Sequence, residues 1–484
     1  MSMFKWDVVF DGKTPPPGAA VGPSERLSWP RTIGLGAQHV VAMFGATFVF
    51  PLIMGLDANL AIMFSGICTI MFLLIVANKV PSYLGTSASF VASVAAIRMQ
   101  GGDSADVTGS IMIAGLVLAA VGVAVHFAGS RLIHAILPPA VTGAVVMLIG
   151  FNLAPVVAGT YWPQDQWIAL LTASALVVFA VLLPGFWSRI AVFLALVFGY
   201  VVSWLADVSF GTINSVLPGQ NLMMADVVDG KTTMVPCPPG GDPSCVAVAF
   251  DHDRVSAWGQ VGQADWIGFP SGVLGDGVDV VHGPSFSLTF ILLVLPGVIA
   301  LIAENTGHVK AVAEMTGDNL DPYMGRAIGA DGLATAFASA FGGSPTTTYA
   351  ENIGVMSATR IYSTAAYYVA AIVAILLGLC PKFGAVVNAI PGGVLGGITV
   401  VLYGMIGLVG AKIWVENRVD FGNPVNMVGL AGGLIAGIGG VTLKITDDFE
   451  LGGIALGTIM VIVYFHLLKG RKEELRADEV TTAP

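Results

Sequence analysis

The chain has 484 residues, of which 55% are hydrophobic and only 11% are charged. A mean hydropathy of +0.81 excludes a soluble globular protein of this length and indicates a polytopic membrane protein. The formal net charge of −10 comes without a basic patch, so no nucleic-acid partner is expected. Four cysteines without a C-x-x-C spacing predict neither a disulfide scaffold nor a zinc site, and we expect no metal and no cofactor.

Apolar runs of about 20 residues, the length that crosses a bilayer core, follow one another along the chain. The first half contains seven expected spans, at residues 33–55, 60–78, 81–96, 111–127, 133–157, 167–183 and 190–205. The second half contains seven more, at residues 286–304, 327–341, 350–358, 365–379, 383–408, 425–441 and 454–468. The sequence therefore predicts an all-α polytopic membrane protein with five parts: an N-terminal tail 1–27, a first repeat 28–205, a loop 206–284, a second repeat 285–470 and a C-terminal tail 471–484.

The third expected span of each half is short and interrupted. Residues 81–96 begin with the small, hydroxyl-rich sequence PSYLGTS, and residues 341–360 begin with FGGSPTTT before they become helical. Irregular backbone inside lipid is tolerated only where protein or a water-filled cavity satisfies its polar groups. Paired broken segments at matching places mark the binding site of an inverted-repeat transporter. We therefore predict two inverted seven-segment repeats, with strand-plus-half-helix elements at segments 3 and 10.

The distribution of basic residues predicts the orientation. With both termini in the cytoplasm and fourteen spans, all but five of the 21 Lys and Arg residues fall on the inner side. The five exceptions are Arg98, Lys231, Arg254, Lys382 and Lys444. Under this orientation the loop 206–284 is external.

Four ionisable residues stand out inside the expected spans. Glu304 and His308 are four residues apart, so they share one face of a continuing helix, and Gly307 between them would let another backbone approach. Glu351 lies where a half-helix starts and free N–H groups are available. Asp331 is the third acid. Intramembrane ionisable groups are functional by default, but a structural ion pair of Glu304 with His308 and a helix-cap role for Asp331 stay open.

Two carboxylates, an imidazole and two half-helix ends suit a small, planar, neutral ligand that has adjacent N–H donors and C=O acceptors. A carboxylate accepts from the donors, while exposed backbone N–H groups donate to the carbonyls. A nucleobase fits this description.

With these residues the chain resembles the nucleobase–ascorbate transporter family, also called nucleobase:cation symporter 2. The resemblance covers nearly all of residues 28–470. The most specific match is ENIGVMSATR at 351–360, with Glu at the position where xanthine and urate members usually have Gln. In having glutamate at this position, the chain resembles the bacterial uracil and pyrimidine permeases of the family. Further matching pieces are Gln38-His39 with AMFGAT, PSYLGTS, PPAVTGA and AENTGH at residues 38–39, 42–47, 81–87, 138–144 and 303–308.

The resemblance implies fourteen helices divided into a core domain and a gate domain, and proton-coupled uracil uptake by alternating access in a bacterial cytoplasmic membrane. The partners implied are uracil, protons, the lipid bilayer and a second copy of the chain in a homodimer. The implied substrate-binding residues are Glu304, His308, Tyr349, Ala350, Glu351, Ala88 and Ala46. We expect Glu304 to be the principal ligand, with Glu304, His308 and Glu351 sharing the proton coupling. The expected supporting residues are Asn352, Asp331, Gln38 and His39.

Alternatives of other kinds stay open at this stage. A purine permease would share the family and the site, and a passive channel would share the architecture. An intramembrane enzyme could use Glu304, His308 and Glu351 as acid and base, although the sequence offers no nucleophile or metal set beside them.

Two local features also leave alternatives open. Gly429, Gly433 and Gly437 form tandem G-x-x-x-G motifs that suit either a dimer face or packing within the chain. Cys237 and Cys245 lie in the expected external loop, where they would either pair or stay free, since spacing alone does not fix connectivity.

Overall fold

The computed structural model describes residues 4–482, except for 17, 130–136, 153, 155–156, 185, 211–221, 229–230, 237–245, 248–258, 260 and 445–449. Cys237 and Cys245 lie outside the described residues, so their pairing stays a prediction. Cys68 and Cys380 are free thiols, and Cys68 is fully buried.

Helices form most of the described chain. In the first half they are α1 (Trp29–Met54), α2 (Ala58–Ile75), α3 (Val91–Met99), α4 (Ser104–Ala128), α6 (Pro139–Asn152), α8 (Gln166–Leu182), α9 (Phe186–Arg189) and α10 (Ala191–Phe210). In the second half they are α12 (Leu288–Thr316), α13 (Met324–Ser339), α14 (Ala350–Thr359), α15 (Thr364–Gly378), α16 (Pro381–Asn388), α17 (Gly392–Glu416), α18 (Pro424–Ile438) and α19 (Gly453–Thr482). Short helical turns are η1 (Phe10–Gly12), η2 (Ala88–Phe90), η3 (Val157–Tyr161), η4 (Trp162–Gln164) and η5 (Asp321–Tyr323).

Strands are short and few among the described residues. They form four small sheets: β1 (Asp7–Val8) with β2 (Glu25–Arg26), β3 (Leu84–Thr86) with β7 (Thr346–Thr348), β4 (Leu222–Val228) with β5 (Lys231–Pro236) and β6 (Val246–Ala247), and β8 (Thr442–Lys444) with β9 (Glu450–Gly452). Of these, the pair β3 and β7 lies inside the helical bundle, where both strands are buried.

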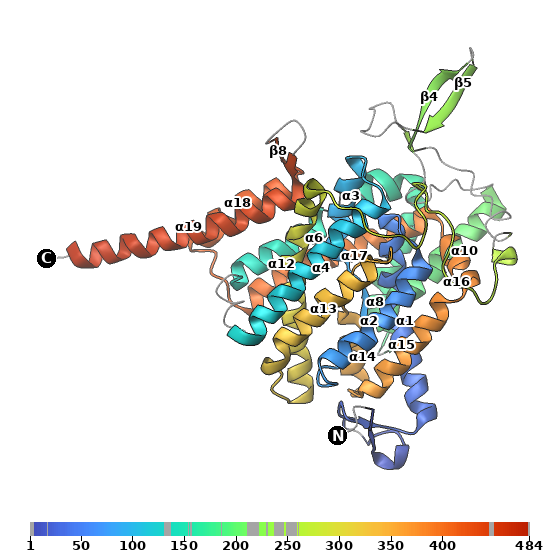
Figure 1. Cartoon of the computed structure of the whole chain (residues 1–484), viewed down its shortest axis with the longest axis horizontal. Helices are drawn as coiled ribbons and strands as arrows, with labels where there is room; N and C mark the ends of the chain where they lie inside the picture. The colour runs from blue at the N-terminus through green and yellow to red at the C-terminus, as the bar shows by residue number, and fades with distance from the viewer. Residues whose placement is uncertain are drawn as a thin grey trace.

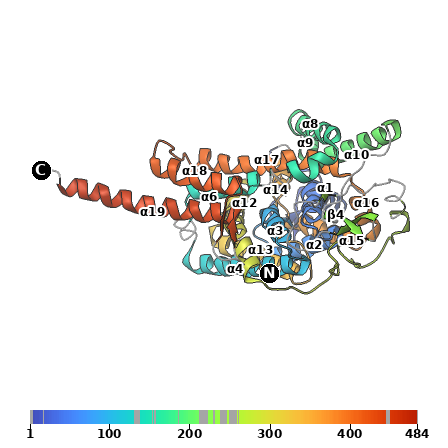
Figure 2. The ribbon, with the colours of Figure 1, turned by 90° about the horizontal axis from the view of Figure 1, so that it is seen from above.

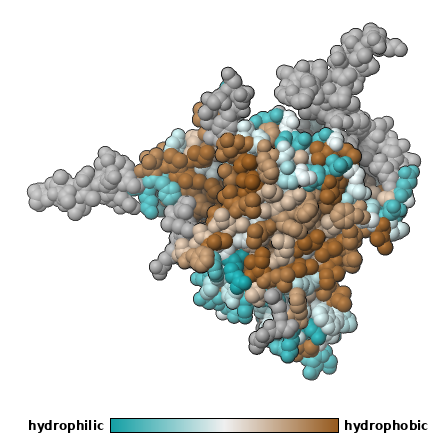
Figure 3. All heavy atoms as spheres, in the orientation of Figure 1, coloured by the Kyte–Doolittle hydropathy of each residue, from teal (hydrophilic) through white to brown (hydrophobic). Residues whose placement is uncertain are grey.

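The helices align as one bundle, with the N-terminus and the β4–β5 hairpin at opposite ends (Figure 1). Seen from above, α6, α8, α10, α17 and α18 lie along one side, α2, α4, α13 and α15 lie along the other, and α3, α12 and α14 lie between them (Figure 2). Apolar side chains cover the middle of the visible face, and polar ones gather toward its two ends (Figure 3). Because large apolar side chains such as Val181, Ile435 and Leu467 are exposed, this surface suits lipid rather than water.

Six helices of the described chain are long and apolar enough to cross a bilayer, or seven when the bent pair α15 and α16 counts as one span. The expected count of fourteen spans therefore stays a prediction. One expected span was wrong. Residues 383–408 are not one helix, because the chain breaks between α16 and α17, where Pro391 caps the second helix. Helix α12 continues beyond the apolar run 286–304 to Thr316, and α19 continues to Thr482.

The two interrupted segments form a strand followed by a half-helix, as predicted, and they also pair with each other. Strands β3 and β7 are antiparallel, with Leu84 opposite Thr348 and Thr86 opposite Thr346. Beyond the strands, Ser87 N–H donates to Pro345 O at 2.9 Å, and Tyr349 N–H donates to Tyr83 O at 3.0 Å. The pairing satisfies backbone groups that lipid cannot satisfy. It brings the first turns of η2 and α14 to the two ends of one small sheet.

Glycines let helices approach each other closely. A Cβ on Gly122 of α4 would lie 2.2 Å from the backbone nitrogen of Gly329 in α13, and one on Gly332 would lie 2.3 Å from Ala119 N. A similar contact joins α6 to α17, where a Cβ on Gly150 would lie 2.1 Å from Gly407 N. Small residues at these positions are typical of helix pairs in membranes, where close van der Waals packing drives association.

The glycine ladder of α18 is used within the chain. A Cβ on Gly433 would lie 2.6 Å from Val461 Cγ2 and 2.7 Å from Gly457 O, both on α19. Gly437 likewise faces Leu148 of α6 and Gly457. Of the two readings of this motif, the structure supports intramolecular packing, so the ladder no longer argues for a homodimer.

Replacing Gly433 by alanine is expected to lower the free energy of unfolding by about 1–3 kcal/mol, because the new methyl group forces α18 away from the α19 backbone. Gly432 is the matched control, because its Cβ would meet only side-chain atoms at 3.7 Å and beyond. Gly432→Ala should leave the melting temperature in detergent unchanged or slightly higher, since alanine favours helix. Equal melting temperatures for the two variants would contradict this packing.

The end of the long loop is attached to the bundle by a charged network. Asp276 accepts from Arg98 Nη1 at 2.5 Å, from Ser104 N–H at 2.7 Å and from the Ser104 hydroxyl at 2.6 Å. Partial burial alone would raise the pKa of Asp276, but hydrogen bonds from Ser104 and Arg98, together with the charge of Arg98, outweigh it and hold that pKa below its ordinary value. The Asp276 carboxylate is therefore the form that stabilises the folded chain.

This shift gives a pH dependence with a defined sign. A carboxyl group with a lowered folded pKa contributes stability above its unfolded pKa of about 4 and loses it as the pH falls through the folded value. Wild type should therefore exceed Asp276→Asn in melting temperature at pH 6, and the difference should shrink steadily below about pH 4. Thermal unfolding of both proteins from pH 6 to pH 3 measures it. A difference that is constant over this range would show that the Asp276 charge contributes nothing.

Candidate functional site

The site is built where the two half-helices begin. Helix α14 starts at Ala350, directly after β7, and η2 starts at Ala88, two residues after β3. Helix α12 contacts β7, α14 and η2, and it carries Glu304 and His308 one turn apart. Because α12 is unbroken through both residues, the prediction that they lie on a continuing helix is confirmed.

The residues around the starts of the two half-helices differ in solvent exposure. Ala350 and Glu351 are exposed although they lie inside the bundle, and Glu304, His308 and Ala88 are half-buried. Gly307 is also exposed, and a Cβ there would meet no atom within 4 Å. The expectation that Gly307 admits another backbone was therefore wrong. Gly307 instead faces open space.

His308 is oriented by a chain of buried hydrogen bonds. Its Nδ1 lies 2.7 Å from the Thr348 hydroxyl, which in turn donates to Asn305 Oδ1 at 3.3 Å. Asn305 Nδ2 donates to Asp331 Oδ2 at 2.6 Å and to Leu301 O at 2.9 Å. Since the single hydroxyl proton of Thr348 goes to Asn305, His308 donates from Nδ1, which leaves Nε2 as the acceptor of the neutral ring.

Asp331 has the supporting place in this chain. It lies within α13, seven residues after the helix begins, so it is not a helix cap. It is fully buried, its Oδ2 accepts from Asn305 Nδ2, and Thr347 lies beside it. The helix-cap alternative is therefore excluded, and Asp331 acts on the site through Asn305 and Thr348.

Asn352 and His39 join α14 to α1. Asn352 Nδ2 lies 3.2 Å from His39 Nδ1 and donates to His39 O at 3.0 Å. The His39 ring packs on Tyr367 of α15 with a centroid separation of 4.4 Å. Both polar side chains are buried, so they support the half-helix rather than face a ligand. Gln38 beside them is half-buried.

The side chain of Tyr349 stabilises the paired strands β3 and β7. Its hydroxyl donates to Thr86 O at 2.8 Å and accepts from Thr47 Oγ1 at 3.2 Å. The ring lies over Gly85, where a Cβ would come within 2.5 Å of it, so only glycine fits there. The Tyr349 N–H also donates to Tyr83 O, so it is not available to a ligand. The first N–H groups of α14, from Ala350 onward, have no side-chain cap.

Three carboxyl groups lie near one another at the site. Glu304 is within electrostatic range of both Asp331 and Glu351, and Thr347 lies next to Glu304 and Asp331. The ion pairs found among the described residues, Arg98 with Asp276 and Lys412 with Glu416, do not include these acids. In this part of the chain no ion pair joins Glu304 to His308 either, so that alternative is not supported. Unpaired acids in such a place are satisfied by a proton or by ligand donors.

Comparison with known proteins decides the family. The permease family model, Xan_ur_permease, matches residues 30–446. The chain belongs to the nucleobase–ascorbate transporter family. This permease is 39% identical over 467 residues to "Putative pyrimidine permease RutG" of Escherichia coli (strain K12), covering 95% of the chain and 94% of that protein. It is 33% identical over 451 residues to the uracil permease of Bacillus caldolyticus, covering 91% and 93% of the two chains. The relatives are permeases rather than enzymes.

Solved structures place the permease in a helical membrane transporter fold. It matches the transmembrane domain of a cyanobacterium bicarbonate transporter, BicA, with a TM-score of 0.53 at 14% identity, over 90% of this chain and 96% of that one. It matches murine Slc26a9, an anion transporter in the inward-facing state, with a TM-score of 0.56 at 11% identity, over 93% and 70% of the two chains. These likenesses concern the fold alone. Together with the apolar helices, the family shows that the permease is a multi-pass membrane protein.

Several residues at the site escaped the sequence reasoning. Asn305, Thr348 and Thr47 carry the hydrogen bonds that orient His308 and Tyr349. The threonines of β7 are β-branched residues that favour strands, and Asn305 follows Glu304 directly. A useful signal was the polar run Glu304-Asn305-Thr306 in an otherwise apolar helix. The side chain of Ala46, on α1, lies outside what the structure describes.

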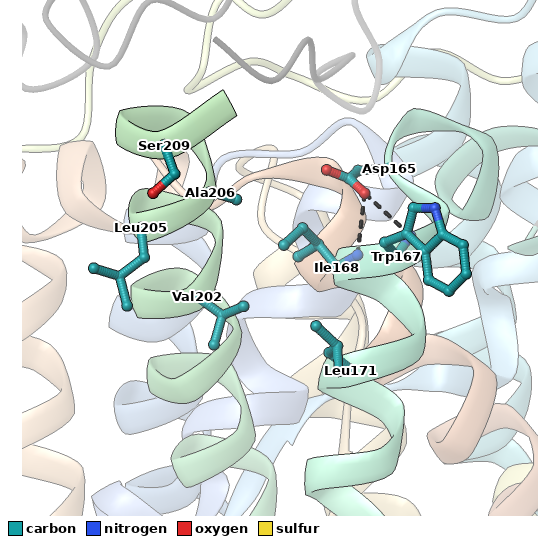
Figure 4. A pocket seen from close by; sticks show the side chains of 8 residues that line it. All are labelled: Asp165, Trp167, Ile168, Leu171, Val202, Leu205, Ala206 and Ser209. Carbon is teal, nitrogen blue, oxygen red and sulfur yellow. Dashed lines mark hydrogen bonds between the residues drawn. The ribbon is translucent and has the colours of Figure 1, made fainter. Parts of the chain in front are cut away.

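A pocket elsewhere in the permease shares no residue with this site. It lies between α8 and α10 and is lined mainly by apolar side chains (Figure 4). Its polar rim contains Asp165, which accepts from the N–H groups of Trp167 at 3.1 Å and Ile168 at 3.0 Å. Asp165 is therefore the N-terminal cap of α8, and its position in the pocket does not require a bound ligand.

Proposed function

We propose that the permease imports uracil together with protons across the bacterial cytoplasmic membrane by alternating access. The observation that carries this proposal is the exposure of Ala350 and Glu351 at the start of a half-helix that contacts α12, the helix of Glu304 and His308. The printed names of the relatives, which are uracil and pyrimidine permeases, support a pyrimidine base as the substrate.

The ligand would be held by complementary hydrogen bonds. Glu304, on the continuous helix α12, has no free backbone donors, so its carboxylate accepts from the N–H edge of the base. The uncapped first N–H groups of α14 donate to a carbonyl oxygen, aided by the positive end of the half-helix dipole. Ala88 begins the opposite half-helix and leaves room for a flat ring.

Proton coupling would use the acids that have no basic partner. Glu351 and His308 both reach accessible space, and each can take up and release a proton. A proton on Glu351 or His308, together with bound uracil, would stabilise the conformation in which the site moves toward the cytoplasm. His308 keeps its orientation through Thr348, Asn305 and Asp331 while it exchanges protons at Nε2.

The architecture we propose for this cycle has fourteen spans in two inverted repeats, 28–205 and 285–470, with both termini cytoplasmic and the loop 206–284 external. Helices α1–α4 and α12–α15 would form the core domain that carries the site, and α6–α10 and α17–α19 the gate domain. The grouping of helices on two sides of α12 in Figure 2 supports this division. We also keep the homodimer as a proposal, without assigning it an interface.

Binding of labelled uracil to the purified permease tests the substrate. We expect saturable binding that unlabelled uracil displaces and xanthine does not. A purine permease is the second candidate, because Ala88 at the start of the opposite half-helix is small. Displacement by xanthine at lower concentration than by uracil would favour that candidate. An absence of saturable binding of either base would contradict nucleobase transport by this site.

A further inference from the structure

Each half-helix of the site ends on an arginine whose guanidinium binds a segment from outside the bundle. Arg98 lies in the last turn of α3, and Arg360 is the residue that ends α14, in a left-handed conformation with φ of 56°. Helices α3 and α14 lie toward opposite ends of the bundle, α14 toward the N-terminal segment and α3 toward the end of the β4–β5 hairpin (Figure 1). The two attachments are built alike, although their sequences are unrelated.

The outer attachment begins at Arg98. Its Nη2 donates to Met54 O at 3.2 Å and to the Ser104 hydroxyl at 2.7 Å, and its Nη1 pairs with Asp276 of the loop. Asp276 also accepts from the backbone and hydroxyl of Ser104, at the start of α4. The end of α3 is thereby joined to α1, to α4 and to the loop through one guanidinium and one carboxylate.

The same loop segment, residues 276–285, also covers the turn that leads into β7. Gly342 in that turn has φ of 85°, and a Cβ there would lie 2.6 Å from Val280 O and 2.8 Å from the His282 ring. His282 Nε2 lies 3.0 Å from the Thr108 hydroxyl of α4, and Ser285 N–H donates to Ala105 O at 2.9 Å. One segment therefore holds both the far end of α3 and the entry to the opposite strand.

The inner attachment is made by residues 4–28. Arg360 Nη1 donates to Gly18 O at 2.8 Å, and Val21 forms a parallel bridge to Ile361, with Val21 N–H donating to Arg360 O at 2.9 Å. Val21, Leu27 and Ile361 form a small buried apolar cluster at this contact. The far end of α14 is thus joined to the N-terminal segment by both backbone and side chain.

The contact continues onto the start of α15. Thr364 Oγ1 donates to Pro23 O at 2.9 Å and accepts from Trp6 Nε1 at 2.8 Å. The rings of Phe4 and Trp6 pack on Tyr368, each with a centroid separation of 5.6 Å. Tyr368 in turn donates to Asn78 Oδ1 at 2.9 Å. Asn78 is left-handed, with φ of 58°, in the turn before β3. The inner segment therefore also reaches the entry to the opposite strand.

We propose that residues 4–28 and 276–285 are two clasps that fix the far ends of α14 and α3 and the entries to β3 and β7. Under this proposal, which rests on the proposed function, Arg98 and Arg360 are positioning residues for the nucleobase site. Their side chains do not face the ligand; they act through the half-helices whose first turns do.

Anchoring at the far ends has a physical reason. A helix of nine or ten residues is not stable alone and depends on its contacts. At the site end, α14 has no side-chain cap to hold it. A ten-residue helix is about 15 Å long, so a tilt of about 10° at the far end would move the site end by roughly 2.6 Å. Such a displacement exceeds the precision of about 0.5 Å that a preorganised site needs.

The outer clasp is tested by Asp276→Ala, with Asp279→Ala as the matched control. Asp279 is an exposed acid three residues further along the same loop. Two quantities are measured on the detergent-purified permease: the Kd for labelled uracil, and hydrogen–deuterium exchange of peptides covering α3 and α14. We expect Asp276→Ala to raise Kd by about 3- to 10-fold and to speed exchange in α3, while Asp276→Glu restores part of the affinity. Asp279→Ala should match wild type.

The inner clasp is tested by Thr364→Val, which keeps the shape of a fully buried side chain and removes the hydroxyl bonds to Trp6 and Pro23. The backbone bond from Thr364 N–H to Pro23 O stays in this variant. Thr316→Val is the control, because the Thr316 hydroxyl bonds only to carbonyls of its own helix and to the next turn. We expect faster exchange in α14 and a raised Kd for Thr364→Val alone. Exchange and Kd equal to wild type in both Asp276→Ala and Thr364→Val would overturn the clasps. A wild-type permease that binds no uracil would instead overturn the proposed function, and the exchange measurement would then decide on the clasps by itself.

Discussion

Replacing Glu304 by alanine is expected to abolish measurable uracil binding. Glu304 is half-buried on an unbroken helix, and under the proposed function the change would leave the N–H groups of the base without an acceptor. Each lost hydrogen bond of this kind costs about 1–3 kcal/mol, so the loss of two raises Kd by about 30-fold or more. Equilibrium binding of labelled uracil to the purified variant measures the effect.

Glu314→Ala is the matched control for this measurement. Glu314 lies on the same helix ten residues further along, where its side chain is exposed. We expect wild-type affinity from Glu314→Ala and a folded monomer or oligomer of unchanged size from both variants. Binding by Glu304→Ala within about 3-fold of wild type would show that another residue accepts from the base.

Glu351→Gln is expected to separate binding from energy coupling. The amide keeps the size and a hydrogen-bonding oxygen of the acid, but it cannot release or accept a proton at neutral pH. The variant should bind uracil and exchange internal for external uracil at rates near wild type, because neither process needs a net proton movement. Uphill accumulation driven by a pH gradient should fall by at least 10-fold.

The exchange assay is the internal control for that variant. A protein that fails in both exchange and accumulation has lost binding or folding, and the Kd then shows which. Uphill uptake by Glu351→Gln at the wild-type level would remove Glu351 as the obligatory proton carrier and move that role to His308 or Glu304. His308→Gln, which leaves the Thr348 contact available, would then be the next variant to compare.

The interrupted segments could be predicted from the sequence because their local signals are strong. Gly342, Gly343 and Pro345 break a helix, and three consecutive threonines favour extended backbone. The antiparallel pairing of β3 with β7 could not be predicted in the same way. Its partners come from opposite halves of the chain, and neither strand carries a turn signal that points to the other.

The helix limits were harder to predict for a different reason. Hydropathy reports the apolar residues that suit lipid, whereas a helix continues for as long as its backbone bonds continue. Helix α12 therefore extends past Glu304 to Thr316, through polar residues that the apolar run excludes. The reverse also occurs, because an apolar run can be longer than one helix. Residues 383–408 stay apolar across Pro391, so hydropathy does not show the break between α16 and α17.

At the site, the charged residues were predictable and their supports were not. Glu304, His308 and Glu351 stand out because ionisable groups in apolar segments are costly and rare. Asn305 and Thr348 are small neutral residues whose role appears only when α12 lies against β7 and brings His308, Thr348, Asn305 and Asp331 into one chain. Gly307 was misinterpreted for the same reason, since sequence alone does not show whether a glycine faces a neighbour or open space.

Proton-coupled nucleobase import is tested most directly by uptake of labelled uracil into proteoliposomes, with and without an imposed pH gradient. An acidic exterior should drive uracil to an internal concentration several-fold above the external one, and a protonophore should collapse that gradient. Glu304→Ala liposomes prepared in parallel should show no accumulation. Uracil uptake that only equilibrates, at the same level with and without the pH gradient, would contradict proton coupling, and no uptake beyond that of empty liposomes would contradict uracil transport itself.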